Sequence, residues 1–318
     1  MLDPTAARAA ELDAASPPVE WPVSRPPHEV VVGADGTVWF SHQTGFGRLR
    51  PRAQAVEVVE LPDARGYFHA LVLQSDGILL GNQGAPALVK VRLDPRGKGR
   101  LAVRAADVST VTLPLPSAHG LSLAADGTLW VTGYCSGKVA RRDPTGRWHE
   151  VAVGGCVEGV AATGDGRAFV ADYGANRVHL VDDRDQVRTV SLPSPCHPHT
   201  VTVAADGRAF AACHAGGIFE LGLEGALKRH AVGDGSLIVG TAADAGGNLW
   251  FAAAVAGKIG KLDSQGRVSF VQPASAGGYP FGVAVGPDGS VWYTLEVAGR
   301  VGRIAGGAAV IAPKVAAP

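Results

Sequence analysis

One phrase occurs seven times along this 318-residue chain, and its regular return constrains the fold more than any other feature. Each copy contains an apolar strand, a tight Asp-Gly or Gly-Gly turn, and a second strand that opens on an apolar residue, as in HGLSLAADGTLWV and FGVAVGPDGSVWY. Such a turn predicts a hairpin because it requires positive φ, which glycine adopts without a steric clash. The copies begin at His28, His69, His119, Glu158, His199, Val239 and Phe281.

A third and a fourth strand are predicted after each hairpin, as in KVARRD at 138–143 and WHEVAV at 148–153. Four strands in about 40 residues are typical of one propeller blade. A two-sheet sandwich also has regular strands, but it would not repeat a four-strand phrase seven times. The sequence therefore predicts an all-β fold, a seven-bladed β-propeller with four antiparallel strands per blade, which occupies residues 19–318 after a flexible lead at 1–18.

Two segments depart from the regular repeat. The second unit is about ten residues longer than the others, and the excess at 95–109 is predicted as a loop between its third and fourth strands. The last unit lacks a fourth strand of its own. Residues 19–23 (VEWPV) or residues 308–314 (AAVIAPK) could supply that strand and close the ring, and the sequence does not decide between them.

Charge and apolar content exclude several classes of partner. The chain has 29 basic and 29 acidic residues, so no broad electropositive field favours nucleic acid or an anionic membrane. It has no apolar run long enough to cross a bilayer and no secretory signal within 1–18, which predicts a cytoplasmic protein with no obligate protein partner evident.

Cysteine thiols are the default state in a reducing compartment, and four cysteines in so long a chain do not suggest a disulfide framework. We therefore expect thiols, with Cys196 and Cys213 as alternative ligands or a redox pair. The four are Cys135, Cys156, Cys196 and Cys213.

Histidines gather on one face of the predicted propeller. In a blade, the start of the first strand and the end of the antiparallel second strand lie on the same face. Seven of the ten histidines fall there: His28, His42, His69, His119, His197, His199 and His214. Neutral imidazole is the commonest metal ligand, and rigid strands can hold several in one shell. An alternative is that these histidines belong to the repeat consensus and only cap the channel.

The residue types at this mouth suggest distinct roles. The predicted metal ligands are His28, His69, His119, His197 and His199, and this nitrogen-rich set favours a transition metal (iron, copper or zinc) over magnesium. Proton transfer is assigned to Glu158, His214, Tyr134 and Tyr173. Substrate contacts are assigned to His42, Tyr279, Phe281 and Val239, the last two of which make one side of the mouth apolar.

The unit His-Gly-x, Asp-Gly-x-Leu-Trp-Phe, Lys-Ile-Gly-Lys-Leu resembles the repeats of the virginiamycin B lyase family, most clearly at 119–142, 239–263 and 281–305. The resemblance implies a seven-bladed propeller in which a magnesium-assisted elimination opens a cyclic depsipeptide at its ester linkage. It also implies metal and general-base residues in the last two blades.

Only one of those family positions keeps its residue type. Glu296 matches the glutamate of the final blade and is therefore a further catalytic candidate. The family's catalytic histidine, the acid two positions before it and the sixth-blade histidine correspond to Phe281, Tyr279 and Val239. Neither Phe nor Val can bind a cation or accept a proton. The hypothesis is that the pocket has moved around the ring, to Glu158, His197, His199 and His214, with His28, His69 and His119 completing it.

Three functions remain open at this point. The first is a metal-dependent, C–O cleaving lyase that acts on a small-molecule or peptide substrate at the axial mouth. The second is an iron- or copper-dependent oxidative enzyme with the same histidine cluster. The third is a propeller that binds a ligand or peptide without turnover.

Overall fold

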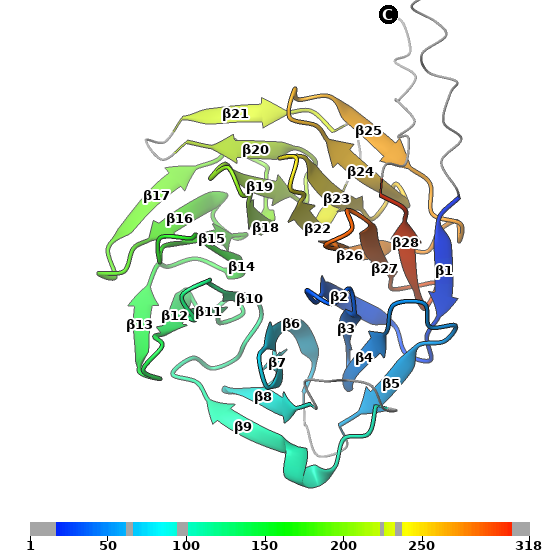
Figure 1. The fold of residues 1–318 in the computed structure, drawn as a ribbon. Helices are drawn as coiled ribbons and strands as arrows, with labels where there is room; N and C mark the ends of the chain where they lie inside the picture. Colours follow the sequence, from blue (N-terminus) through cyan, green and yellow to red (C-terminus); the bar gives the residue numbers. More distant parts are fainter. Residues whose placement is uncertain (1–16, 62–65, 94–100, 223–225, 233–236, 307–318) are drawn as a thin grey trace, which may run out of the picture.

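In the computed structural model, which describes residues 17–61, 66–93, 101–222, 226–232 and 237–306, seven four-stranded antiparallel sheets surround a central axis (Figure 1). The first strand of each unit is innermost and the fourth is outermost. This confirms the predicted seven-bladed propeller. Residues 1–16 of the predicted lead lie outside the described residues.

The strands follow the repeat units along the chain. The first three blades contain β2 (Pro27–Val32), β3 (Val38–His42), β4 (Gly45–Leu49) and β5 (Glu57–Glu60); β6 (Phe68–Gln74), β7 (Gly77–Asn82), β8 (Ala87–Arg92) and β9 (Val108–Thr112); β10 (Leu121–Leu123), β11 (Leu129–Thr132), β12 (Lys138–Arg142) and β13 (Trp148–Ala152). The next three contain β14 (Val157–Ala162), β15 (Ala168–Asp172), β16 (Arg177–Val181) and β17 (Val187–Ser191); β18 (Pro198–Val203), β19 (Ala209–Cys213), β20 (Ile218–Leu221) and β21 (Leu227–His230); β22 (Ile238–Ala243), β23 (Leu249–Ala253), β24 (Lys258–Leu262) and β25 (Val268–Val271).

The seventh blade joins the two ends of the propeller. It contains β26 (Pro280–Val285), β27 (Val291–Leu295), β28 (Arg300–Ile304) and, as its outermost strand, β1 (Val19–Pro22). Trp21 of β1 stacks on Trp292 at 5.5 Å between ring centroids, and the Glu20 carboxylate accepts a hydrogen bond of 2.9 Å from the Tyr293 hydroxyl. The N-terminal candidate therefore supplies the closing strand, and residues 308–314 lie outside the described residues.

The long second unit has its excess where it was expected. Between β8 and β9 the described chain forms a short 3-10 helix, η1 (Ala105–Asp107), and residues 94–100 lie outside the described part. The predicted loop was slightly too long, because β9 already begins at Val108.

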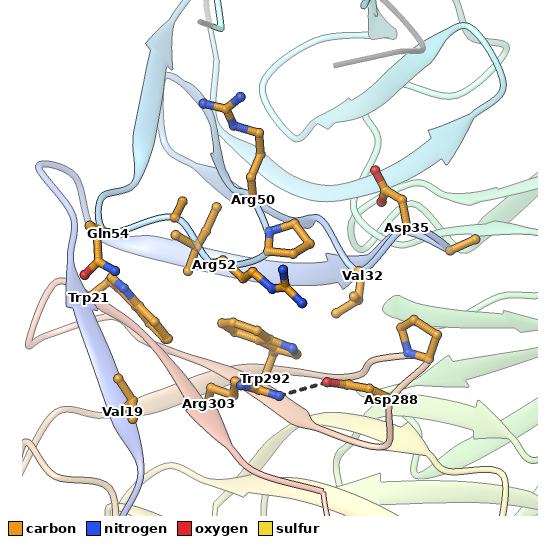
Figure 2. Close-up of a pocket in the computed structure, with 16 residues that line it drawn as sticks. Val19, Trp21, Val32, Asp35, Arg50, Arg52, Gln54, Asp288, Trp292 and Arg303 are labelled. Atoms are coloured by element: carbon orange, nitrogen blue, oxygen red, sulfur yellow. Dashed lines mark hydrogen bonds and ion pairs between the residues drawn. The ribbon is translucent and has the colours of Figure 1, made fainter. Parts of the chain in front are cut away.

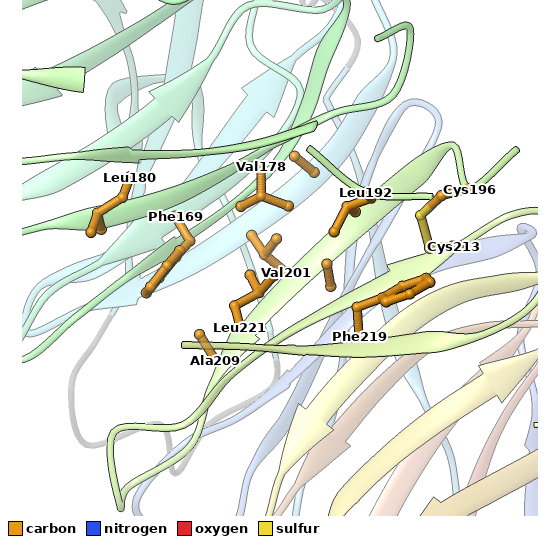
Figure 3. Packing of buried hydrophobic residues seen from close by; sticks show 12 residues of the cluster. Phe169, Val178, Leu180, Leu192, Cys196, Val201, Ala209, Cys213, Phe219 and Leu221 are labelled. Atoms are coloured by element: carbon orange, nitrogen blue, oxygen red, sulfur yellow. A yellow bond between two sulfur atoms is a disulfide. The ribbon is translucent and has the colours of Figure 1, made fainter. Parts of the chain in front are cut away.

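Adjacent blades pack through apolar side chains on their facing surfaces. Between the fourth and fifth blades, Phe169 and Leu180 contact a cluster that includes Val201 and Phe219 (Figure 3). Each such layer removes apolar area from water, which stabilises the ring at about 25 cal/mol per Å². No helix among the described residues is long and apolar enough to cross a membrane.

The innermost strands approach one another so closely that some positions require glycine. A Cβ atom on Gly240 would lie 2.1 Å from the Phe281 carbonyl oxygen, and one on Gly282 would lie 2.6 Å from that of His28. Second-strand hydroxyls bridge neighbouring blades at the same level, because Ser41 and Thr294 donate to the carbonyls of His69 and His28. The backbone that carries the residues at the mouth is therefore rigidly held.

The expectation of free thiols is wrong in this structure. Cys135 pairs with Cys156, and Cys196 pairs with Cys213. In each pair, one cysteine (Cys156 or Cys196) lies in the loop before a first strand. The other (Cys135 or Cys213) lies at or just after the end of a second strand, on the same face of the propeller. Cys196 and Cys213 are thus disulfide partners, so neither offers a free thiolate as a ligand, and a redox role for the pair stays a prediction.

Candidate functional site

The residues that open the repeats do lie around the axis. In six of the seven blades, the pairing of the first and second strands is interrupted beside this residue. The register shifts, for example, between Pro27 and Val30 and between Pro198 and Thr200. The exceptional blade is the third, where β10 begins only after His119. A bulge adds a residue and re-aims its side chain, here toward the mouth.

Three histidines form the centre of the site, and we call His69, His119 and His199 the axial histidine cluster. One ring nitrogen from each lies within 4.8 Å of the others. The rings of His69 and His119 stack at 4.0 Å, and the His199 ring lies 6.1 Å from that of His119. All three also line an axial cavity of about 380 Å³.

Burial keeps the axial histidine cluster neutral. It lowers the pKa of His119 to about 3 and the pKa values of His69 and His199 below the ordinary 6.5. His199 Nδ1 lies 2.8 Å from the Val239 carbonyl oxygen, which can only accept, so Nδ1 carries the proton and Nε2 carries the lone pair. This is the tautomer that a metal ligand requires.

The donor set fits a transition metal better than magnesium. His69 Nδ1 and His119 Nδ1 are buried without a hydrogen-bond partner among the described residues, as is Glu158 Oε2. Buried polar atoms rarely lack partners, so these suggest a missing ligand. Two nitrogens bound to the same tetrahedral metal by bonds of about 2.1 Å lie about 3.4 Å apart. The ring nitrogens here lie within 4.8 Å of one another, so metal binding would require the rings to move by about 1 Å. Magnesium prefers oxygen, which this cluster does not supply.

Glu158 lies beside the axial histidine cluster and suits proton transfer. Its Oε2 is 3.7 Å from His199 Nε2, and the residue is 5% exposed. Burial raises the pKa of the Glu158 carboxyl to about 7. A general acid or base works best when its pKa is near the operating pH, so Glu158 meets this condition at neutral pH.

The raised pKa of Glu158 makes Glu158→Gln a test of the site's electrostatics. Below about pH 4.5 the Glu158 carboxyl is protonated in both the folded and the unfolded protein. Between about pH 4.5 and 7 it ionises in the unfolded protein but stays protonated in the folded one, so the wild-type free energy of unfolding falls as the pH rises through this range. We expect the metal-free variant to gain about 3 kcal/mol over wild type at pH 8 and nothing at pH 4. Urea unfolding at both pH values measures this difference, and an equal effect at both would contradict it.

Further predicted residues surround this centre. His214 stacks on His199 at 4.5 Å, and burial lowers its pKa to about 3, which makes it a weak base. Tyr134 stacks on His119 at 5.1 Å and is 44% exposed. The Tyr173 ring lies 5.2 Å from that of His214, one step farther from the cluster.

A second polar group lies between the seventh, first and second blades. The Tyr67 hydroxyl hydrogen-bonds to His28 Nε2, and Glu296 Oε1 lies 3.9 Å from the same nitrogen. His28 is therefore engaged by Tyr67 and lies outside the group of three nitrogens. Burial lowers the pKa of His28 to about 4 and raises that of Glu296.

Sequence reasoning missed Tyr67, although a signal was present. Tyr67 stands two positions before the ring residue His69, as Tyr279 stands before Phe281 and His197 before His199. Residues two positions before the start of a repeat therefore also contribute side chains to the mouth.

Some predicted residues lie apart from the cluster. His42 is fully buried and its Nε2 lies 3.1 Å from the Val59 carbonyl oxygen, so it has no surface with which to contact a ligand. His197 Nδ1 lies 3.2 Å from the Tyr173 carbonyl oxygen, and His197 does not belong to the group of three nitrogens.

The apolar residues predicted to contact substrate border the histidines. The Phe281 ring stands edge-on to His28, His69 and His199, with centroids 5.2, 5.5 and 6.3 Å away. Val239 is buried, and Tyr279 packs with it and Phe281 against the apolar cluster of the last two blades. The mouth thus has a polar side and an apolar side.

Comparison with known proteins decides the family. The model of the virginiamycin B lyase family matches residues 20–221 and 210–317. The chain belongs to this family. A virginiamycin B lyase from Nocardia farcinica is 30% identical over 211 residues, which cover 65% of this chain and 70% of that protein.

Several solved structures share the fold. A streptogramin B lyase structure matches with a TM-score of 0.79 and 19% identity, covering 90% of this chain and 96% of that one. A catalytically inactive variant of virginiamycin B lyase from Staphylococcus aureus, solved with quinupristin, matches with a TM-score of 0.78 and 18% identity, covering 90% and 98%. A propeller with a bound peptide matches with a TM-score of 0.69 and 13% identity, covering 92% and 96%.

Proposed function

We propose that this chain is a metal-dependent lyase that cleaves a C–O bond in a small-molecule or peptide ester at the axial mouth, with a divalent transition metal on the axial histidine cluster. Membership of the virginiamycin B lyase family supports the reaction class. The observation that carries the site is the set of three neutral imidazoles whose ring nitrogens lie within 4.8 Å of one another beside a buried carboxylate.

Each residue near the cluster has a distinct task in this proposal. His69, His119 and His199 would hold the metal, which when bound supplies a Lewis acid for a substrate carbonyl. Glu158 accepts the proton from the carbon next to that carbonyl, because its pKa near 7 leaves a fraction of carboxylate at neutral pH. Tyr134 covers the open side of His119, and Phe281 forms the apolar wall against which the substrate packs.

The reaction can be distinguished by the mass of its product. The protein, purified without a histidine tag, is first assayed for bound metal and then incubated with a cyclic depsipeptide of the streptogramin B class. Elimination opens the ring at the ester without adding water, so the linear product has the mass of the substrate and a new carbon–carbon double bond. Hydrolysis would add one water. We expect an unchanged mass, a retained metal, and loss of turnover in Glu158→Gln.

Two specific observations favour other functions, and the same assay addresses both. A ligand set of three imidazoles also suits iron or copper, so oxygen consumption with either metal would indicate an oxidative enzyme. The apolar wall at Phe281 and Val239 suits a ligand bound without turnover. If no metal is retained and no added metal raises the melting temperature, the metal proposal is wrong.

A further inference from the structure

The Cys135–Cys156 disulfide lies at the same mouth as the axial histidine cluster. Cys135 is in the turn after β11 and Cys156 is in the loop before β14, so their bond joins the third and fourth blades. Cys135 is exposed and Cys156 is partly exposed. A reductant in solution can therefore reach this bond.

Glu158 adds a third donor beside the two sulfur atoms. A carboxylate oxygen of Glu158 and the sulfurs of Cys135 and Cys156 all lie within 4.8 Å of one another. Glu158 is 5% exposed, and its Oε2 has no hydrogen-bond partner among the described residues. A buried, unpartnered oxygen next to two sulfurs suggests a place where a cation belongs.

Backbone hydrogen bonds hold both cysteines independently of the bond between them. The Cys135 amide donates to the Val157 carbonyl at 3.3 Å, and the Cys156 amide donates to Asp172 Oδ1 at 2.9 Å. The Cys156 carbonyl in turn accepts from the Tyr173 amide at 2.9 Å. Reduction would thus leave the two sulfurs near each other and near Glu158, which lowers the entropic cost of forming a metal site.

We propose that the reduced thiols of Cys135 and Cys156, together with Glu158, form a site for a soft divalent cation such as zinc. A dithiol reductant transfers two electrons and two protons to the disulfide, which breaks the sulfur–sulfur bond, and the reductant becomes a disulfide. The cation then binds two thiolates and one carboxylate, releases the two thiol protons, and keeps a position for water or a ligand. The site uses no histidine; it shares Glu158 with the proposed lyase but does not rest on that activity.

The second disulfide provides an internal comparison. Cys196 and Cys213 are 1% and 0% exposed and lie within the apolar cluster shared by the fourth and fifth blades (Figure 3). Little solvent reaches that bond, so we expect Cys135–Cys156 to be reduced first. Thiol counting after mild reduction should give two free thiols, assigned to Cys135 and Cys156 by peptide mapping.

Cadmium is the probe, because thiolate bound to cadmium gives an ultraviolet charge-transfer band that histidine and carboxylate do not. The whole protein is titrated with cadmium after treatment with a phosphine or with buffer alone. We expect one equivalent to bind with the band in reduced protein and no band in oxidised protein. Cys135→Ser should abolish the band, and Glu158→Gln should weaken binding at least about tenfold.

Matched variants separate this site from the axial histidine cluster and from general effects. Glu150→Gln alters an ion-paired surface carboxylate of the third blade and should leave the titration unchanged. His69→Ala should keep the charge-transfer band even where it removes histidine-bound metal. A missing band in protein shown to carry both thiols would overturn the proposal, as would a band that survives in Cys135→Ser. Unfolding of the protein on reduction, seen by circular dichroism, would also overturn it.

Discussion

Replacing His119 by alanine is expected to lower the affinity of the protein for a transition metal by at least about 100-fold. His119 contributes one of three ring nitrogens within 4.8 Å, and its removal leaves only the nitrogens of His69 and His199 in that group. The same loss is expected for His199→Ala, because His199 Nδ1 is fixed by the Val239 carbonyl and its Nε2 carries the lone pair. Isothermal titration with zinc, together with elemental analysis, measures both losses.

The control for these variants is His149→Ala. His149 belongs to β13, an outermost strand, and its Nε2 lies 3.4 Å from an Asp143 carboxylate oxygen, far from the mouth. We expect its metal content to equal that of wild type. Thermal unfolding of the metal-free variants shows whether a lost affinity reflects a lost fold. Equal metal losses in all three variants would mean that the cluster does not hold the metal.

Removal of residues 1–22 is expected to destabilise the propeller by at least about 5 kcal/mol, a large part of the total for a domain. The deletion leaves β28 as an unpaired edge and uncovers Trp292, which β1 otherwise covers through Trp21. It also removes Glu20, which accepts hydrogen bonds from Tyr293 and Ser275. An exposed edge strand favours aggregation, so we expect a lower melting temperature and the appearance of large aggregates in gel filtration.

Two comparisons make the effect of β1 specific. Val19→Ser changes a side chain that is 53% exposed and should leave the melting temperature within a degree or two of wild type. A synthetic peptide of residues 17–26 added to the truncated chain should bind the open edge and restore part of the lost stability. A truncated chain that melts like wild type would show that β1 does not close the ring.

The pocket on the other face of the molecule illustrates why a large cavity alone does not define a site. It has a volume of about 690 Å³ at the junction of the first and seventh blades, near the turns that carry Asp35 and Asp288 (Figure 2). In this pocket the guanidinium group of Arg303 lies over the ring of Trp292, and the ammonium group of Lys261 lies over Trp250 in the same way in the sixth blade. This stacking is part of how a blade packs, whereas the histidine mouth brings together His69 Nδ1, His119 Nδ1 and Glu158 Oε2, which are buried without a hydrogen-bond partner among the described residues.

The repeat by itself determined the architecture of this protein. An Asp-Gly turn favours a hairpin wherever it occurs, and the spacing of seven such hairpins leaves room for four strands in each unit. The shared face of His69, His119 and His199 followed from the same periodicity, because strand direction alone decides which ends of a blade lie together.

Only the tertiary structure decided which of those residues meet. The sequence placed seven histidines on one face, but the packing of neighbouring blades brings three ring nitrogens together, engages His28 with Tyr67, and buries His42 against Val59. The pairing of the cysteines depends on how adjoining loops and strand ends meet, and the choice of β1 as the closing strand depends on its contacts with β28 at the other end of the chain. Periodicity fixes the face on which a side chain lies, whereas its partner is set by packing between blades, and a repeat does not encode that packing.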